Sequence, residues 1–153
     1  MFTGIIQALG KIQSKVTYDK GATLVFSSND LDFSTVVIGD SIAVNGVCLT
    51  AIEINDDGFK ADLSQETLDC SIFGGLEQGS SVNLEKALRL NQGIDGHLVS
   101  GHVDGIATVL DRFNEGDSTR FKISAPSNLV KYIARKGSVC INGVSLTVNN
   151  IDA

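Results

Sequence analysis

The sequence has few basic residues for its length. Its 12 lysines and arginines stand against 18 acidic residues and give a net charge of −6, which is the wrong sign for electrostatic binding to nucleic-acid phosphates or anionic lipid. No apolar run approaches the roughly 20 residues that a membrane helix requires. The first residues, MFTGIIQ, also lack the basic region and long apolar run of a signal peptide. We therefore disfavour nucleic-acid and membrane-surface roles and expect a cytoplasmic protein.

Cysteine is scarce too. Cys48, Cys70 and Cys140 are odd in number and far apart, with no Cys-x-x-Cys pair, so the pattern favours reduced thiols over a disulfide framework or a zinc site. His97 and His102 differ by an odd number, so on a strand they would point to opposite faces and could not share an ion. We predict no metal site, and we interpret His97 as structural or solvated.

An internal repeat dominates what remains. The segment SIAVNGVCLT at residues 41–50 recurs as SVCINGVSLT at 138–147, and Thr3-Gly4 recurs as Ser100-Gly101. The offset from Gly4 to Gly101 and from Ser41 to Ser138 is 97 residues in both cases, so the copies align without a gap. Such a repeat predicts two domains of one fold. We divide the chain into a first barrel at 1–88, a linker at 89–97 and a second barrel at 98–153.

The local signals are mostly those of β-structure, and the spacing of the strands is typical of a small barrel or sandwich. Short stretches rich in β-branched residues, bounded by turn formers, predict strands over Ala22–Phe26, Ser41–Val44, Val47–Ile54, Gly58–Leu63 and Ser81–Leu84. The dipeptides Asn45-Gly46 and Asn142-Gly143 predict a type I′ hairpin turn in each copy. Short helices are predicted over Leu31–Ile38, over its counterpart Asn128–Arg135, and after Ser64.

Within this sequence the second copy is shorter than the first. The first copy ends its strand pattern near Leu88, so at the same offset the second would run about 32 residues past Ala153. A barrel that lacks its last strands exposes unpaired edges. We expect either that the sequence is a fragment or that a partner chain completes the second barrel.

Five ordered motifs carry a specific resemblance: MFTGII at 1–6, GDSIAVNGVCLT at 39–50, DLSQET at 62–67, GHLVSGH at 96–102 and KGSVCINGVSLT at 136–147. Together they resemble riboflavin synthase of the alpha-chain type over the whole chain. The resemblance implies an all-β fold of two tandem six-stranded Greek-key barrels, the second incomplete here, and trimers assembled through a C-terminal helix.

The resemblance also implies a reaction. Two molecules of 6,7-dimethyl-8-ribityllumazine dismutate by transfer of a four-carbon unit and give riboflavin and 5-amino-6-ribitylamino-pyrimidinedione, with no cofactor or metal. The lumazine synthase that makes the substrate is suggested as a protein partner. A reaction between two identical molecules gives the repeat a rationale, because two similar pockets can hold the pair in register.

In the family the active site lies between the first barrel of one subunit and the second barrel of a neighbour. Carried over by motif, the contacts of the first barrel fall on Gly4, Ile5, Ile6, Cys48, Leu49, Thr50, Asp62, Leu63, Ser64, Gln65, Glu66 and Thr67. Those of the second barrel fall on Gly101, His102, Val103, Lys136, Ser145, Leu146 and Thr147. The copies differ at Ile5/His102, Cys48/Ser145 and Gly39/Lys136, where donor and acceptor roles are expected to diverge.

The chemistry requires loss of a proton from the C7 methyl of one lumazine and addition of a nucleophile at C7 of the other. His102 is the candidate for proton transfer, because imidazole titrates near neutrality. Ser145 and Thr147 are expected to hydrogen-bond developing charge, and Cys48 to act as a nucleophile or as a polarizable wall. Phe2 is expected to pack over the ring, and bound water remains an alternative nucleophile.

Two other functions deserve comparison. A lumazine- or flavin-binding protein of the same fold that binds without turnover would lose polar groups at the reactive ring edge, whereas this chain keeps Cys48, His102, Lys136 and Ser145. A flavin reductase barrel would need an Arg-x-Tyr/Phe-Ser/Thr motif and a nicotinamide-binding domain, and neither is found in the sequence. The enzyme is therefore favoured.

Overall fold

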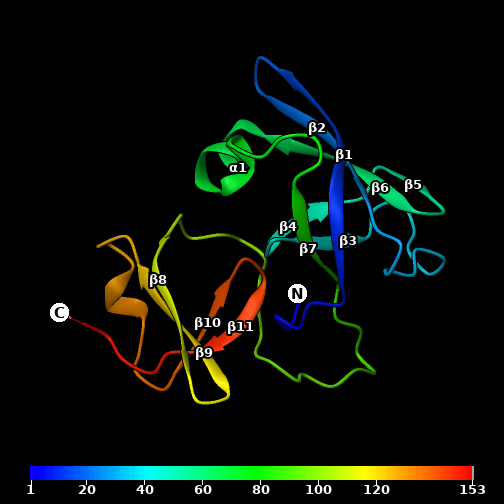
Figure 1. Cartoon of the computed structure of the whole chain (residues 1–153). Coiled ribbons are helices and arrows are strands. Elements are labelled where there is room, and N and C mark those ends of the chain that lie inside the picture. The colour runs from blue at the N-terminus through cyan, green and yellow to red at the C-terminus, as the bar shows by residue number, and fades with distance from the viewer. Residues whose placement is uncertain (153) are drawn as a thin grey trace.

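A computed structural model describes residues 1–152 and shows a β-rich molecule in two parts (Figure 1). The first copy contains β1 (Ala8–Tyr18), β2 (Gly21–Ser27), β3 (Ser41–Val44), β4 (Val47–Thr50), β5 (Glu53–Asn55), β6 (Gly58–Ser64) and β7 (Ser81–Lys86). Helix α1 (Gln65–Cys70) and the 3-10 turn η1 (Ile72–Gly74) lie between β6 and β7. No helix within residues 1–152 combines the length and apolar character that crossing a bilayer requires.

The antiparallel sheet of the first copy closes into a barrel. Its strand order is β4-β3-β7-β1-β2-β6-β5, so its two edge strands, β4 and β5, follow each other in the chain. They form one strand interrupted at residues 51–52, which pairs with β3 on one side and with β6 on the other. The amide of Ile52 also donates to the carbonyl of Lys60 in β6 at 2.9 Å. The predicted strand over 47–54 is thus present but bent, and the barrel has six strands.

The core of the molecule lies inside this first barrel. Phe26, Phe59 and Phe73 are fully buried there, with the rings of Phe26 and Phe59 stacked at 5.1 Å and Phe73 edge-on to Phe26 at 6.1 Å. Aromatic pairs in these geometries add stability beyond the area that they bury. The first barrel therefore supplies a rigid base for the elements around it.

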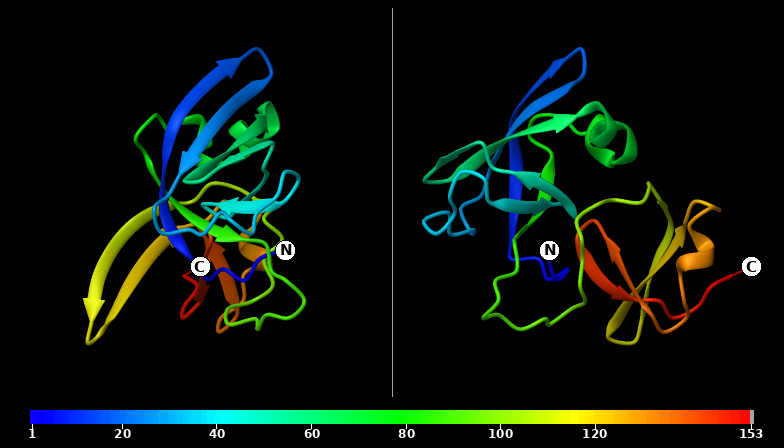
Figure 2. Two further views of the ribbon diagram at one scale, coloured as in Figure 1. Left: turned by 90° about the vertical axis from the view of Figure 1, so that its right-hand side faces the viewer. Right: turned by 180° about the vertical axis from the view of Figure 1, so that it is seen from behind.

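The second copy contains β8 (Thr108–Glu115), β9 (Ser118–Ser124), the 3-10 turn η2 (Val130–Tyr132), β10 (Ser138–Ile141) and β11 (Val144–Thr147). Within residues 1–152 these strands form two separate hairpins, β8-β9 and β10-β11, and the β8-β9 hairpin projects away from the first barrel in Figure 2. Val109, Phe113 and Phe121 are each about half exposed. The inner face of the second copy is therefore largely uncovered in this part of the chain.

The repeat is visible in the backbone as well as in the sequence. Gly39 donates to Ala51 at 2.8 Å, and their counterparts Lys136 and Val148 make the same bond at 2.6 Å. Both Asn-Gly turns have positive φ at both central residues, which confirms the predicted type I′ geometry. The two turns also touch each other, since a Cβ added to Gly46 would lie 2.7 Å from the amide nitrogen of Gly143.

Of the three predicted helices, one is present, one is absent and one is reduced to a 3-10 turn. The helix after Ser64 is confirmed as α1, whose N-cap hydroxyl accepts from the amide of Thr67 at 3.2 Å. The predicted helix over Leu31–Ile38 is wrong, because this segment contains only a bend, turns and irregular backbone. Its β-branched run at 35–38 disfavours a helix, and the Asp32 carboxylate accepts from the amide of Ser34 at 2.9 Å. Of the helix over 128–135 only η2 forms, while β1, the longest strand, is not among the predicted elements.

The segment at the start of each copy lies against the other copy. We call residues 1–6 the first arm and residues 98–103 the second arm. Phe2 and Val99 pair with each other through two backbone hydrogen bonds of 2.7 and 2.9 Å. Beyond that pair, each arm runs onto the other copy, and the N-terminus lies beside β11 in Figure 1. The two copies are therefore interlocked at their junction.

Candidate functional site

Each arm lies against a strand of the opposite copy: the first arm against β11 and the second arm against β4. The Gly4 carbonyl of the first arm accepts from the amide of Ser145 in β11 at 2.7 Å, and the Gly101 carbonyl of the second arm accepts from the amide of Cys48 in β4 at 2.8 Å. These contacts are equivalent under the offset of 97. They create two related sites, which we call the Ser145 site and the Cys48 site.

Only glycine fits where the arms cross. Gly4 and Gly101 have φ of +75° and +82°, a region that side chains disfavour. A Cβ on Gly4 would lie 2.8 Å from the Cβ of Ser145, and one on Gly101 would lie 2.6 Å from the Cβ of Cys48. Thus the Thr3-Gly4 and Ser100-Gly101 repeat reflects a requirement for close approach.

This exchange corrects the expected grouping of the site residues. We expected Gly4, Ile5 and Ile6 to share a site with Cys48, because all belong to the first copy. The structure instead places Gly4 against Ser145, and Ile6 at the Gly143 turn of the second copy, where a Cβ on Gly143 would meet its Cδ1 at 3.2 Å. Conversely, the second arm, with Gly101, His102 and Val103, lies at the Cys48 site.

The Ser145 site contains His97, which we interpreted from the sequence as structural or solvated. His97 Nδ1 lies 2.7 Å from Ser145 Oγ, and the amide of His97 donates to the Thr3 carbonyl of the first arm at 3.0 Å. Both side chains are partly buried. Because successive strand residues alternate in direction, Ser145 and Thr147 point to one face of β11. An imidazole, two hydroxyls and the first arm are thus brought together.

The Cys48 site repeats the contact between an arm glycine and a strand, with a thiol in place of the Ser145 hydroxyl. Cys48 is partly buried and Thr50 exposed on the same face of β4. His102 follows Gly101 on the second arm with its side chain exposed, and its amide donates to Ser100 Oγ at 3.1 Å. We expected His102 to share a site with Ser145, whereas the structure places Gly101, the residue before His102, against Cys48.

The predicted residues at the end of β6 and the start of α1 form a polar row. Thr23 Oγ1 donates to Asp62 at 2.5 Å, and the hydroxyls of Ser64 and Thr67 share a hydrogen bond of 3.1 Å. The Glu66 carboxylate accepts from Cys70 Sγ at 3.3 Å, and this hydrogen bond raises the pKa of the Cys70 thiol. The row offers several acceptors and hydroxyls of the kind that can bind a polyhydroxyl chain.

Three predicted contacts can involve only part of the residue. Leu49 and Leu63 are buried in the core of the first barrel, so they can offer a ligand only backbone groups. Phe2 is fully buried in a small cluster with Ala43 and Val99 that joins the two copies. Its ring has no exposed surface in this structure, and its packing over the substrate stays a prediction.

Lys136 occupies a backbone position normally suited to glycine. Its φ is +66°, and its counterpart in the first copy is Gly39 with φ of +95°. The lysine side chain is exposed, and its Nζ donates to Asn149 Oδ1 at 3.4 Å. A lysine in a left-handed conformation costs about 1–2 kcal/mol relative to glycine at this position.

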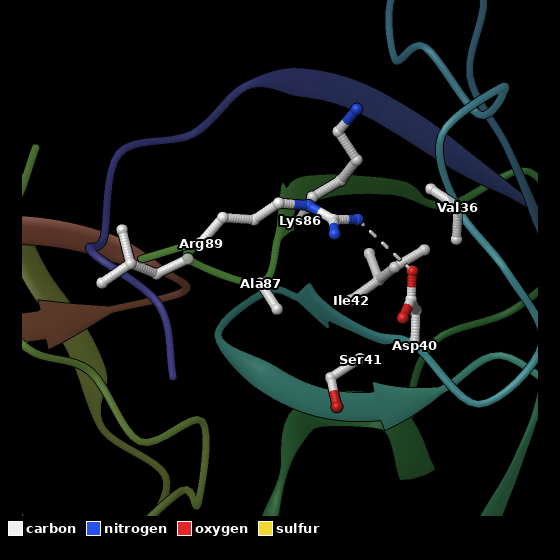
Figure 3. A pocket seen from close by; sticks show the side chains of 8 residues that line it. Val36, Asp40, Ser41, Ile42, Lys86, Ala87 and Arg89 are labelled. Carbon is white, nitrogen blue, oxygen red and sulfur yellow. Dashed lines mark ion pairs between the residues drawn. The ribbon is translucent and has the colours of Figure 1, made fainter. Parts of the chain in front are cut away.

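Two cavities lie near these sites. One of about 120 Å³ beside β3 is lined by Asp40, Ser41, Lys86 and Arg89 among others (Figure 3). Its cations already have partners, because Arg89 lies 3.6 Å from Asp40 and Lys86 donates to the Asp32 carbonyl at 2.9 Å. A larger cavity of about 520 Å³ extends from the second arm into the second copy and is lined by His97, His102 and Cys140 among others. The larger cavity thus touches both histidines, while neither Cys48 nor Ser145 lines it.

Comparison with known proteins identifies the family of the chain. A family model described as the lumazine binding domain matches residues 3–87 and again residues 100–153. The chain therefore belongs to the lumazine-binding domain family, and within it to the riboflavin synthases, which are transferases. Riboflavin synthase from Photobacterium leiognathi is 44% identical over 151 residues, which cover 99% of this chain and 69% of that protein. Riboflavin synthase from Saccharomyces cerevisiae is 39% identical over 159 residues, covering 99% and 67%.

Solved structures show the same fold. The crystal structure of LumP complexed with riboflavin matches with a TM-score of 0.89 at 28% identity, covering 99% of this chain and 82% of that one. LumP complexed with 6,7-dimethyl-8-(1'-D-ribityl) lumazine matches with a TM-score of 0.86 at 29% identity, covering 99% and 81%. The resemblance found in the sequence and the predicted fold class are both confirmed.

Proposed function

We propose that the chain catalyses the dismutation of two 6,7-dimethyl-8-ribityllumazine molecules. One molecule gives up its C6, C7 and both methyl carbons and leaves as 5-amino-6-ribitylamino-pyrimidinedione. The other accepts these four carbons and becomes riboflavin. Because the two products together contain all atoms of the two substrates, the reaction needs no external oxidant or reductant. The proposal therefore includes no cofactor and no metal.

The observation that carries this proposal is the reciprocal contact of Gly4 with Ser145 and of Gly101 with Cys48. It gives one chain two sites of the same plan but with different reactive groups. A reaction between identical molecules in different roles needs such sites, and holding the pair in register can lower the barrier by roughly 7–11 kcal/mol. The complexes of LumP with riboflavin and with the lumazine support the ligand class.

We assign roles on this basis. In the Ser145 site, His97 orients or deprotonates the Ser145 hydroxyl. Ser145 and Thr147 hydrogen-bond the charge that develops on a bound lumazine, and the Lys136 ammonium stabilises it. In the Cys48 site, His102 transfers a proton and Cys48 lies against the ring edge. The ribityl chain is bound by the polar row from Asp62 to Thr67. The backbone groups of both arms complete the two sites.

Following the family, the Cys48 site of one subunit faces the Ser145 site of a neighbour within a trimer, so that two lumazines meet at the subunit boundary. The lumazine synthase that makes the substrate is proposed as a partner, and the cytoplasm as the location. The three free cysteines, Cys48, Cys70 and Cys140, are compatible with a reducing compartment.

The test is to incubate the protein with the lumazine alone and to quantify lumazine, riboflavin and the pyrimidinedione during the reaction. We expect two lumazines consumed for each riboflavin and each pyrimidinedione formed. Saturable lumazine binding without product would instead favour the binding protein of the same fold. A requirement for nicotinamide would contradict the proposed chemistry.

A further inference from the structure

A buried carboxylate connects the first barrel to the first arm. Glu85 lies in β7 and is only 2% exposed. Its Oε1 accepts from the amide and the hydroxyl of Thr3 at 2.6 and 2.7 Å, and its Oε2 accepts from the amide of Gly4 at 3.1 Å. None of the ion pairs found among residues 1–152 involves Glu85. Three hydrogen-bond donors of the arm thus stabilise this carboxylate.

The chemistry of these contacts requires two acceptor oxygens. A buried carboxylate is costly unless it is well hydrogen-bonded, and apolar packing alone would not need one. Glutamine at this position could still accept from Thr3 with its carbonyl oxygen. Its NH₂ group, however, would face the N–H of Gly4 and could not accept from it. Glu85 therefore fixes the direction of two successive backbone amides in the arm.

The same two arm residues hold both members of the histidine–serine pair. The Thr3 carbonyl accepts from the amide of His97 at 3.0 Å, and the Gly4 carbonyl accepts from the amide of Ser145 at 2.7 Å. Glu85 binds the N–H groups of Thr3 and Gly4, and their carbonyls bind His97 and Ser145. A rigid connection therefore runs from the core strand β7 to the bond between His97 Nδ1 and Ser145 Oγ.

We propose that Glu85 is a positioning residue for the His97–Ser145 pair, acting through Thr3 and Gly4. This inference rests on the proposed function for its effect on turnover but not for its effect on structure. Misplacing a reactive group by about 1 Å can reduce a rate by about 100-fold. Loss of the hydrogen bonds from Thr3 and Gly4 to Glu85 is accordingly expected to reduce kcat more than it raises KM.

The test uses four variants of the full chain, each assayed for turnover and for backbone amide hydrogen exchange. Glu85→Gln should reduce kcat by about 10- to 100-fold, with KM changed by less than about threefold. Thr3→Val, which removes one of the three donors, should have a smaller effect in the same direction. Thr3→Ser keeps the hydroxyl and should retain the wild-type rate. Glu77→Gln, an exposed glutamate on the loop before β7, serves as the matched control and should behave as wild type.

Amide exchange separates this inference from the proposed function. In Glu85→Gln the amides of His97 and Ser145 should exchange faster, while those of Leu24 and Ala61, in the paired strands β2 and β6, keep their protection. Unchanged exchange at His97 and Ser145 would overturn the positioning role, whatever the activity. If the wild type shows no turnover, the proposed function fails while the exchange data still decide the role of Glu85. If Glu85→Gln does not fold, Thr3→Val and Thr3→Ser decide it.

Discussion

The imidazole of His97 and the hydroxyl of Ser145 are joined at 2.7 Å across the boundary between the linker and β11. The contact depends on the first arm, which holds the amides of both residues. The linker that carries His97 and the strand that carries Ser145 are each hydrogen-bonded to the first arm. The pair is therefore a product of how the two copies interlock, and it defines the Ser145 site.

If His97 acts only through Ser145, the two residues should behave as one unit. Ser145→Ala and His97→Ala are each expected to reduce kcat by about 100-fold, a typical contribution of proton transfer. The double variant should lose little more than either single variant. Ser118→Ala, at an exposed serine of β9, serves as a control. Losses that multiply in the double variant would mean that the residues act independently.

The crossing of the first arm should tolerate no side chain at Gly4. Gly4→Ala introduces both a strained φ and a contact with Ser145, whereas Gly79→Ala introduces a strained φ of +89° with nothing within 4 Å. The difference in unfolding free energy between the two variants isolates the close approach, and we expect about 1–3 kcal/mol more loss at Gly4. Denaturant unfolding measures it. Equal losses would show that the arm does not lie against β11.

Replacing Lys136 should separate stability from activity. Lys136→Gly relieves the left-handed backbone and should stabilise the protein by about 1 kcal/mol, while Lys136→Ala keeps the strain. Both variants remove the ammonium group and should reduce kcat/KM equally. Thermal unfolding and steady-state kinetics test the two effects. An active Lys136→Gly variant would refute a role for the ammonium in the Ser145 site.

The thiol of Cys70 should react slowly because its hydrogen bond to Glu66 raises its pKa. A raised pKa leaves less thiolate at a given pH, so alkylation at pH 8 should be slow and should accelerate as the pH rises. Glu66→Gln removes the acceptor charge and should accelerate alkylation of Cys70 at that pH. Mass spectrometry of iodoacetamide-treated protein gives the rate. No change at Cys70 would mean that Glu66 does not control this thiol.

Much of the fold follows from local signals in the sequence. The Asn-Gly turns, β3, β6 and the capped start of α1 at Ser64 were predicted because each depends on residues close in the chain. The segment at 31–38 was not, because tertiary burial of Leu31, Phe33 and Val36 overrides its apparent helical pattern.

The site was harder to predict. The offset of 97 shows that Gly4 and Gly101 are equivalent, but an arm on its own copy and an arm on the other copy make the same local contacts. Sequence similarity therefore cannot distinguish the exchanged arrangement from the unexchanged one. His97 has no counterpart in the first copy, because the offset maps it ahead of Met1, so comparison of the two copies could not associate it with Ser145.

The distribution of carbon-13 label in the riboflavin formed from a mixture of labelled and unlabelled lumazine tests the central claim most directly. The protein is incubated with an equal mixture of unlabelled lumazine and lumazine carrying carbon-13 at C6, C7 and both methyl groups, and the riboflavin is analysed by mass. Transfer between two lumazines predicts riboflavin with no, one or two labelled four-carbon units in proportions of one to two to one. Absence of the species with two labelled units, or absence of riboflavin altogether, would contradict the account.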